Sequence, residues 1–240
     1  MKLIGTEIVV ECLNREKVEV VFGIPGGAIM PLYDAIYQKA SFTHILTKHE
    51  QGAMHAADGY ARATGKVGVC IATSGPGATN LVTGLANAYL DSIPVVAFTG
   101  QVASPLIGTD AFQEVDITGI TMPVTKNNYL VMNVNDLAAT IKEAFSLAKN
   151  GRPGPVLIDL PKDIQQAQTE FYYSEKDKNS SYSFSSKRNL NQIKKAANAI
   201  QKAKRPVIYA GGGIITSGAS QELWDFVQKT NIPVTTTLMG

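Results

Sequence analysis

The chain alternates short apolar runs with longer segments that carry apolar residues on one helical face, and this alternation restricts the fold most. Residues 67–73 form an almost continuous apolar run, whereas residues 6–17 place Ile8, Val9, Cys12 and Leu13 at helical spacing. Buried strands that alternate with amphipathic helices form βαβ units, in which parallel strands are covered by helices on both faces. The sequence therefore predicts an α/β fold with a doubly wound, mainly parallel sheet.

The same pattern predicts the individual elements of this first region. Between residues 100 and about 128 it predicts a long irregular stretch. The expected helices are 6–17, 31–40, 50–64, 78–90 and 135–149, and the expected strands are 18–22, 42–47, 67–73, 94–99 and 155–160.

Composition changes at about Gln165, where Ser, Lys, Glu, Asp and Tyr replace most apolar residues. We expect a first domain over 1–164, a linker over 165–188 and a second α/β region over 189–240. The last region predicts helices at 190–203 and 221–230 and strands at 206–210 and 232–237. Two strands are fewer than the ~5–6 that a sheet usually has. We therefore expect residues 189–240 to be only the beginning of the second domain.

Charge and composition exclude several classes of protein. Twenty-two basic and 20 acidic residues give a net charge of +2, which is small for a nucleic-acid binder. The sequence has no apolar run long enough for a membrane span, and Glu7 and Glu11 interrupt the N-terminal apolar stretch, unlike a secretory signal. Cys12 and Cys70 lack metal or redox spacing, so we expect buried thiols in a cytoplasmic protein.

Three loops are expected at the carboxyl ends of strands, where doubly wound sheets bind ligands: 23–28, 48–53 and 74–80. Each also has a plain structural interpretation as a tight βα connection, and Glu50 could simply oppose a helix dipole, worth ~0.3–1 kcal/mol. The loops match neither the Walker phosphate motif nor GxGxxG, and His49 and His55 lack the zincin spacing. No metal ligands are assigned. The irregular stretch 108–116 is long enough to be functional.

Five segments in order resemble a known family. They are 22–28 (FGIPGGA), 49–53 (HEQGA), 73–80 (TSGPGATN), 108–114 (GTDAFQE) and 152–163 (RPGPVLIDLPKD). Together they resemble the large catalytic subunit of the acetolactate synthases, thiamine-diphosphate enzymes of valine, leucine and isoleucine biosynthesis. The Ala-Phe-Gln-Glu segment at 111–114 is similar to the biosynthetic, FAD-containing branch.

The resemblance implies a function and a domain plan. Pyruvate would be decarboxylated, and the resulting two-carbon unit would condense with a second pyruvate or with 2-oxobutyrate. Residues 1–164 would be the pyrimidine-binding domain, and 189–240 the beginning of a central FAD-binding domain. The diphosphate-binding domain, whose Gly-Asp-Gly motif the sequence lacks, would supply the Mg²⁺ ligands. The family also implies a homodimer or tetramer, a small regulatory subunit, and no activity for these 240 residues alone.

The resemblance also implies roles for individual residues. Glu50 would hold a proton at the pyrimidine ring, in a pocket where burial favours the protonated carboxyl. Gln113, together with Phe112, would lie over the reaction centre across a dimer interface, and Lys162 would lie near the channel mouth. The other implied cofactor contacts are Gly26, Gly27, Ala28, Gly75, Pro76 and Asn80 for thiamine diphosphate, and Arg152, Gly211, Gly212, Gly213, Thr237, Leu238 and Met239 for FAD.

Two alternatives stay open. The chain could be an inactive truncated or regulatory remnant of such an enzyme, or it could belong to a related thiamine-dependent 2-oxo acid decarboxylase or carboligase. The Phe112-Gln113 pair and Lys162 favour the synthase. Without the resemblance, Lys162 would be a surface lysine and 211–213 an ordinary βα turn.

Overall fold

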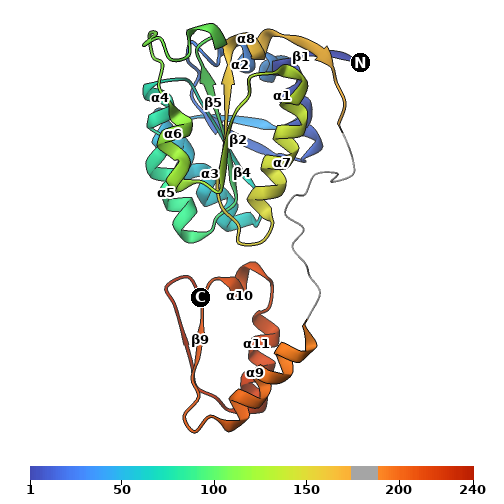
Figure 1. The fold of residues 1–240 in the computed structure, drawn as a ribbon, viewed down its shortest axis with the longest axis vertical. Coiled ribbons are helices and arrows are strands. Elements are labelled where there is room, and N and C mark those ends of the chain that lie inside the picture. The colour runs from blue at the N-terminus through green and yellow to red at the C-terminus, as the bar shows by residue number, and fades with distance from the viewer. Residues whose placement is uncertain (174–188) are drawn as a thin grey trace. The chain divides into compact units, whose positions relative to one another are not determined.

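The computed structural model describes residues 1–173 and 189–240, and the chain divides into two compact units, Met1–Ser183 and Phe184–Gly240 (Figure 1). None of the described helices combines the length and the apolar character that crossing a membrane requires.

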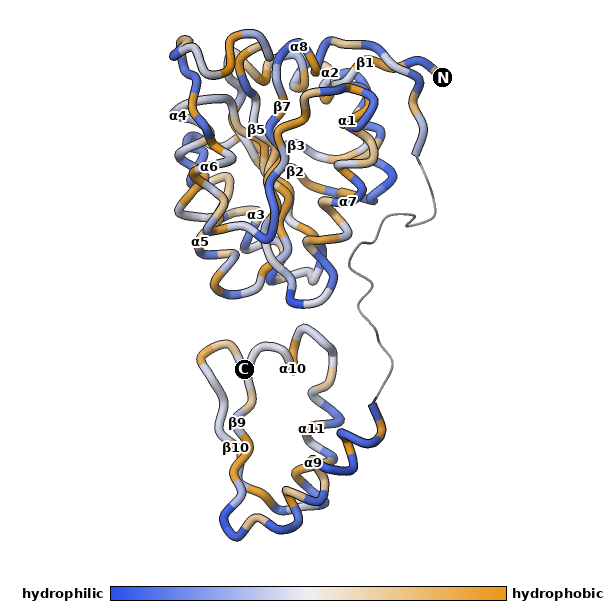
Figure 2. Tube along the Cα trace, in the orientation of Figure 1, coloured by the Kyte–Doolittle hydropathy of each residue, from blue (hydrophilic) through white to orange (hydrophobic). Residues whose placement is uncertain are grey.

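A six-stranded sheet forms the centre of unit 1. All of its pairings are parallel, and the strand order is β3-β2-β4-β5-β7-β6. The strands are β2 (Val20–Gly23), β3 (Thr43–Leu46), β4 (Gly68–Ala72), β5 (Val95–Gln101), β6 (Asn127–Leu130) and β7 (Val156–Pro161). β4, β5 and β7 are buried along their whole length, which explains why most of their residues are apolar (Figure 2). Thr99 and Gln101 on β5 and Asp159 on β7 are buried polar exceptions.

Helices cover both faces of this sheet with two separate cores. The pleat sends neighbouring strand residues to opposite sides, so Val69 lies in one core and Cys70 in the other. The first core contains α1 (Gly5–Arg15), α2 (Met30–Lys39) and α7 (Leu137–Lys149), and the second contains α3 (Glu50–Thr64), α4 (Pro76–Thr79), α5 (Val82–Asp91) and α6 (Ile117–Thr121). The predicted doubly wound α/β fold is confirmed.

The structure differs from the sequence-based expectation at three places in unit 1. The helix expected over 78–90 divides into α4 and α5, because the Leu81 amide bonds three residues back, to Ala78, rather than four. The stretch expected to be irregular contains α6 and the edge strand β6, whose residues are too polar to be recognised as a buried strand. It also contains the short 3₁₀ turns η1 (Ser104–Leu106) and η2 (Met122–Val124), and η3 (Val134–Asp136) follows it.

The third difference concerns where the chain leaves unit 1. Residues 165–173, expected to open the linker, stay on unit 1 as the end of α8 (Lys162–Gln166) and as β8 (Gln168–Glu170). β8 pairs antiparallel with β1 (Lys2–Ile4), and the Arg15 guanidinium lies 5.3 Å and 5.4 Å from the ring centres of Phe171 and Tyr173. These contacts explain why the segment is ordered despite its polarity. The rest of the expected linker, 174–188, lies outside the described residues.

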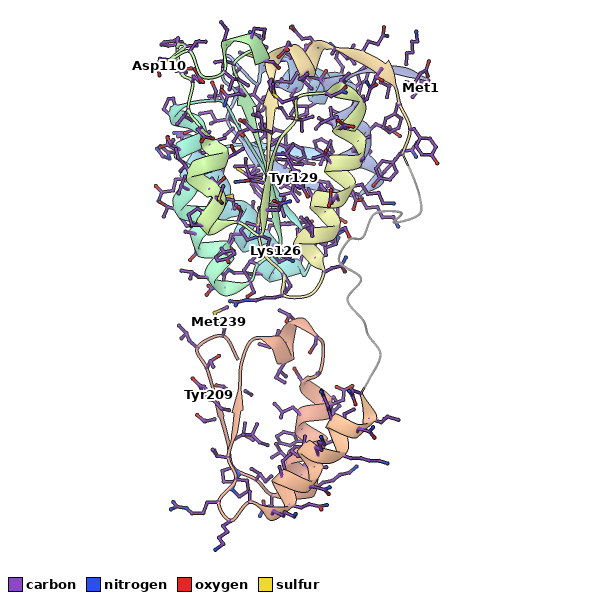
Figure 3. All side chains as sticks on the ribbon, in the orientation of Figure 1. Met1, Asp110, Lys126, Tyr129, Tyr209 and Met239 are labelled. Atoms are coloured by element: carbon purple, nitrogen blue, oxygen red, sulfur yellow. The ribbon has the colours of Figure 1, made fainter. Side chains whose placement is uncertain are left out.

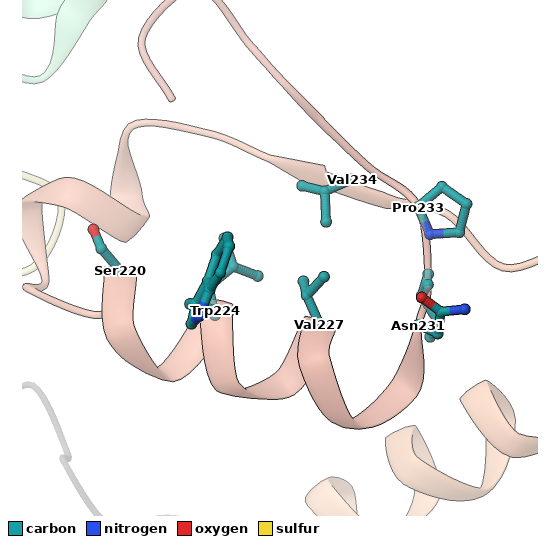
Figure 4. A pocket seen from close by; sticks show the side chains of 8 residues that line it. Ser220, Trp224, Val227, Asn231, Pro233 and Val234 are labelled. Carbon is teal, nitrogen blue, oxygen red and sulfur yellow. The ribbon is translucent and has the colours of Figure 1, made fainter.

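The described part of unit 2, residues 189–240, contains a parallel pair of strands and three helices. They are α9 (Leu190–Lys202), β9 (Ile208–Ala210), α10 (Gly213–Thr216), α11 (Ser220–Thr230) and β10 (Val234–Thr236), so the expected helices and strands are confirmed. Among described residues 189–240, only Ala210 and Ile232 are buried. A pocket of about 500 Å³ lies between α11 and β10, where Trp224 and Val227 point toward Val234 (Figure 4).

Candidate active site

The candidate site lies where the strand order of unit 1 reverses. From β2 the chain crosses to β3 on one side and then returns to β4 on the other side of β2. The loops that follow β2 and β4 therefore diverge at the carboxyl edge of the sheet, and such a switch point is where open α/β sheets bind ligands. Two of the loops singled out in the sequence, 23–28 and 74–80, flank this point.

Glu50 enters the site as the first residue of α3. His49 caps this helix, because its Nδ1 accepts a hydrogen bond from the Gln51 amide at 3.1 Å. The Asn80 side chain donates to Glu50 Oε2 at 3.0 Å, which ties α3 to the turn after α4. Within the part of the chain that the structure describes, Glu50 Oε1 makes no hydrogen bond, and the side chain is half-buried rather than enclosed in a pocket.

Two glycines bring the loops around Glu50 into close contact through Thr73. A Cβ added at Gly26 would lie 2.5 Å from Thr73 Cβ, and one added at Gly77 would lie 2.7 Å from Thr73 Cγ2 and 3.2 Å from Glu50 Oε1. Thr73 Oγ1 also accepts a hydrogen bond from the Ala28 amide at 3.2 Å. The missing side chain of Gly77 therefore keeps space open beside the free carboxyl oxygen.

Ala28 is held from its other side by α8. Gln165 Nε2 donates to the carbonyl oxygens of Ala28 at 2.7 Å and Leu160 at 2.8 Å. Gly100 supports the same peptide, because a Cβ there would lie 2.8 Å from the Ala28 carbonyl carbon. Gly27, by contrast, has nothing within 4 Å of an added Cβ, so it faces open space.

The loop from Val102 to Asp116, hereafter the site loop (residues 102–116), reaches the same edge. Gly75, at φ +57°, lies so close to it that an added Cβ would be 2.6 Å from the Gln113 carbonyl oxygen. Gln113 itself adopts φ +58°, an uncommon conformation for a residue with a side chain. The Glu114 carboxylate accepts hydrogen bonds from the amides of Gly108 and Ala111, and the Gly108 bond contributes most to lowering its pKa.

Two other predicted residues lie near the strand ends. Lys162 is exposed and begins α8, directly after β7, and its neighbour Asp163 accepts a 2.8 Å bond from the Ser104 amide of the site loop. Arg152 precedes β7 and so lies at the amino edge of the sheet, where it donates to Ser92 Oγ at 2.7 Å. In Figure 3, Asp110 lies toward the carboxyl edge of the sheet of unit 1, and Lys126, just before β6, lies toward the amino edge.

The predicted FAD contacts of unit 2 gather at the carboxyl ends of β9 and β10. A Cβ at Gly212 would lie 2.9 Å from the Met239 carbonyl oxygen, and the Thr237 amide donates to Ala210 at 2.8 Å. The structure thus brings 211–213 together with 237–239.

The sequence did not indicate the side chains whose hydrogen bonds support the loops of the site: Thr73, Gln165, Gln101 and Asp159. Thr73 lay within a recognised motif, but Gln165 fell in the expected linker.

The two cysteines are buried and free, as predicted, and burial raises the pKa of both thiols. In residues 1–173 and 189–240, no group of three or more His, Cys, Asp or Glu side chains is arranged to hold a metal ion.

Comparison with known families agrees with this geometry. Residues 4–120 match the N-terminal TPP binding domain of thiamine pyrophosphate enzymes, and residues 193–240 match the central domain of the same enzymes. The chain belongs to the thiamine pyrophosphate enzymes.

Within this class, its relatives are acetolactate synthases. The chain is 55% identical over 239 residues to the acetolactate synthase large subunit of Corynebacterium glutamicum, covering 100% of this chain and 38% of that protein. It is 52% identical to the large subunit of Buchnera aphidicola subsp. Acyrthosiphon pisum, covering 99% and 42% respectively. A probable acetolactate synthase large subunit of Methanococcus aeolicus is 53% identical, covering 98% and 40%. The chain thus spans about two fifths of the length of these curated relatives, and the family predicted from the sequence is confirmed.

Proposed function

We propose that this chain forms the pyrimidine-binding part of a thiamine-diphosphate-dependent acetolactate synthase. The reaction would decarboxylate pyruvate and join the two-carbon unit to a second pyruvate or to 2-oxobutyrate. The observation that carries the proposal is the Glu50–Asn80 pair at the switch point of the sheet, which leaves one carboxyl oxygen free beside Gly77. Identity of 52–55% to acetolactate synthases over the whole chain supports the same assignment.

The residues around Glu50 fit the pyrimidine ring of thiamine diphosphate. The cofactor, when bound, supplies the electron sink for decarboxylation. Glu50 Oε1 would hold a proton at a ring nitrogen, and the Asn80 bond to Oε2 keeps the carboxyl in one orientation for this. The backbone of Gly26, Gly27 and Ala28 would line the approach, since Thr73 and Gln165 fix Ala28 from both sides.

The remaining assignments extend this proposal. Phe112, Gln113 and Lys162 would contact substrate. The resemblance implies that Phe112 and Gln113 act across a dimer interface, but the site loop lies against Gly75 of the same chain, which favours a place for Gln113 near the ring that this chain binds. Residues 211–213 and 237–239 of unit 2 would contact FAD. Arg152 is assigned to FAD from the family resemblance alone. Mg²⁺ would take its ligands from outside this chain. The large subunits would associate as a dimer or tetramer with a small regulatory subunit, in the cytoplasm.

The test is Glu50→Gln in the holoenzyme with thiamine diphosphate, magnesium and FAD. The amide cannot exchange a proton with a ring nitrogen as the carboxyl does, so acetolactate formation should fall by about 10²–10⁴-fold. Exchange of the cofactor C2 proton should be lost, whereas thermal unfolding should stay unchanged.

The matched control is Glu11→Gln, which removes a carboxylate from an exposed pair with Arg15. This variant should keep wild-type rates. Near-normal C2-proton exchange in Glu50→Gln would overturn the assigned role of Glu50. A wild-type holoenzyme that forms no acetolactate from pyruvate would overturn the proposed activity.

A further inference from the structure

The site loop meets the candidate site through Gln113. Both ends of this loop are hydrogen-bonded to one buried side chain, that of Gln101. Gln101, the last residue of β5, is 3% exposed. It belongs to none of the sequence motifs. Its hydrogen bonds nevertheless reach both ends of the site loop.

The side-chain amide of Gln101 binds both ends of the site loop. Gln101 Oε1 accepts a hydrogen bond from the Val102 amide at 2.9 Å, and Gln101 Nε2 donates to the Val115 carbonyl at 2.9 Å. Val102 begins the site loop and Val115 lies next to its end. Fixing the two ends of a loop to one rigid group removes much of the loop's conformational freedom.

Asp159 fixes the orientation of this amide. Its Oδ2 accepts the second Nε2 hydrogen of Gln101 at 2.9 Å, and its Oδ1 accepts from Thr99 Oγ1 at 2.7 Å. Asp159 lies on β7, is 1% exposed and is paired with Thr99 of β5, so its carboxyl cannot shift without disturbing the sheet. With both Nε2 hydrogens and the Oε1 oxygen bonded, the Gln101 amide has only one satisfied orientation.

We propose that Gln101, oriented by Asp159, is a positioning residue that sets the site loop against Gly75 and so places Phe112 and Gln113 at the site. The link to catalysis rests on the proposed function. The positioning of the site loop by Gln101 does not rest on the proposed function, because it follows from the hydrogen bonds alone.

The experiment compares Gln101→Met with Thr99→Val in the holoenzyme. Each variant removes one buried hydrogen bond to the same Asp159 carboxyl at nearly constant volume, but only Gln101 also binds the site loop. Amide hydrogen exchange of residues 103–116 should speed up about tenfold or more in Gln101→Met and stay within about twofold in Thr99→Val. The value of kcat/KM for pyruvate should fall about 10- to 100-fold in Gln101→Met only.

Equal effects of the two variants on loop exchange would overturn the proposal, because they would assign the effect to general stability. Unchanged loop exchange in Gln101→Met would overturn it as well. A wild-type protein without acetolactate formation would count against the proposed function alone, since the exchange measurement does not require turnover.

Two further measurements cover a failure of Gln101→Met to fold. Gln101→Asn keeps an amide but is one methylene too short to bond Val115 and Asp159 together, and it should loosen the loop in the same way. In the wild-type protein, the Val102 amide should exchange as slowly as the β5 amides. Fast exchange at Val102 would contradict the proposal without any variant.

Discussion

Asp159 is a buried carboxyl group of unit 1 whose pKa lies well above its ordinary value. Burial raises the pKa of this carboxyl to about 7, against the opposing effect of the hydrogen bonds from Thr99 and Gln101. The negative charge of Asp116, at the end of the site loop, adds to the increase. The folded protein therefore holds a proton at pH values where the unfolded chain has released it.

This difference predicts how Asp159→Asn changes the pH dependence of stability. A raised carboxyl pKa contributes stability that is complete below about pH 4 and is lost as the pH rises through about 7. Asn imitates the neutral acid, since its oxygen can accept from Gln101 and its NH₂ can donate to Thr99, and it does not titrate. From pH 5 to pH 8 the wild-type free energy of unfolding should fall relative to the variant, by an amount on the order of 1–3 kcal/mol.

The measurement is urea unfolding of both proteins at several pH values, followed by circular dichroism. A difference between wild type and Asp159→Asn that stays constant from pH 5 to pH 8 would contradict the shifted ionisation.

At the scale of elements, the glycines at the switch point show how closely two loops must approach. Gly26 and Gly27 are neighbours in the sequence, and neither adopts a positive φ. Only Gly26 lies against Thr73, however, and this contact connects the loop after β2 to the loop after β4. The two positions therefore form a natural matched pair.

Gly26→Ala should lower the free energy of unfolding by about 1–3 kcal/mol, because its methyl group would overlap Thr73. Gly27→Ala should change it by less than about 0.5 kcal/mol, because its methyl group would enter open space. Urea unfolding of the two variants gives the comparison directly. Equal destabilisation would show that the two loops are not packed as described.

The elements also show which parts of the structure can be predicted from local sequence patterns. The expected helix 50–64 is the observed α3, because a cap at His49 and a left-handed Gly65 mark its two ends in the sequence. β6 and the β1–β8 pair were missed, since their residues are polar or few and their pairing partners are distant along the chain.

In the candidate site, too, residues in local motifs could be predicted, whereas residues that act through long-range contacts could not. Glu50, Asn80 and the glycine loops belong to local motifs and could be predicted. Thr73 and Gln165, however, act on Ala28 across separations of 45 and 137 residues, and Gln101 reaches Asp159 across 58. No local pattern in one sequence indicates such contacts.

At the scale of the whole molecule, the two units differ in how much they bury. Unit 1 has two extensive cores, whereas Ala210 and Ile232 are the only buried positions in described residues 189–240. Trp224, the only tryptophan in the sequence, is 60% exposed in unit 2. Its fluorescence therefore reports on unit 2 alone.

For the 240-residue chain we expect tryptophan emission at the wavelength of a solvated indole, with strong quenching by iodide. Amide exchange after residue 188 should also be faster than in the central strands of unit 1, because few of these residues are shielded from water. Iodide-resistant, blue-shifted emission would contradict the exposed position of Trp224.

The pairing of β1 with β8 has a mechanical consequence. The first and last described segments of unit 1 lie next to each other, joined by backbone pairing and by the bond from the Met1 amino group to Glu170 (Figure 1). A pull on the chain beyond residue 173 would first unzip this short ribbon and separate Arg15 from its two aromatic rings. The six-stranded sheet, and the loops that shape the site, would carry that load only after the ribbon had opened.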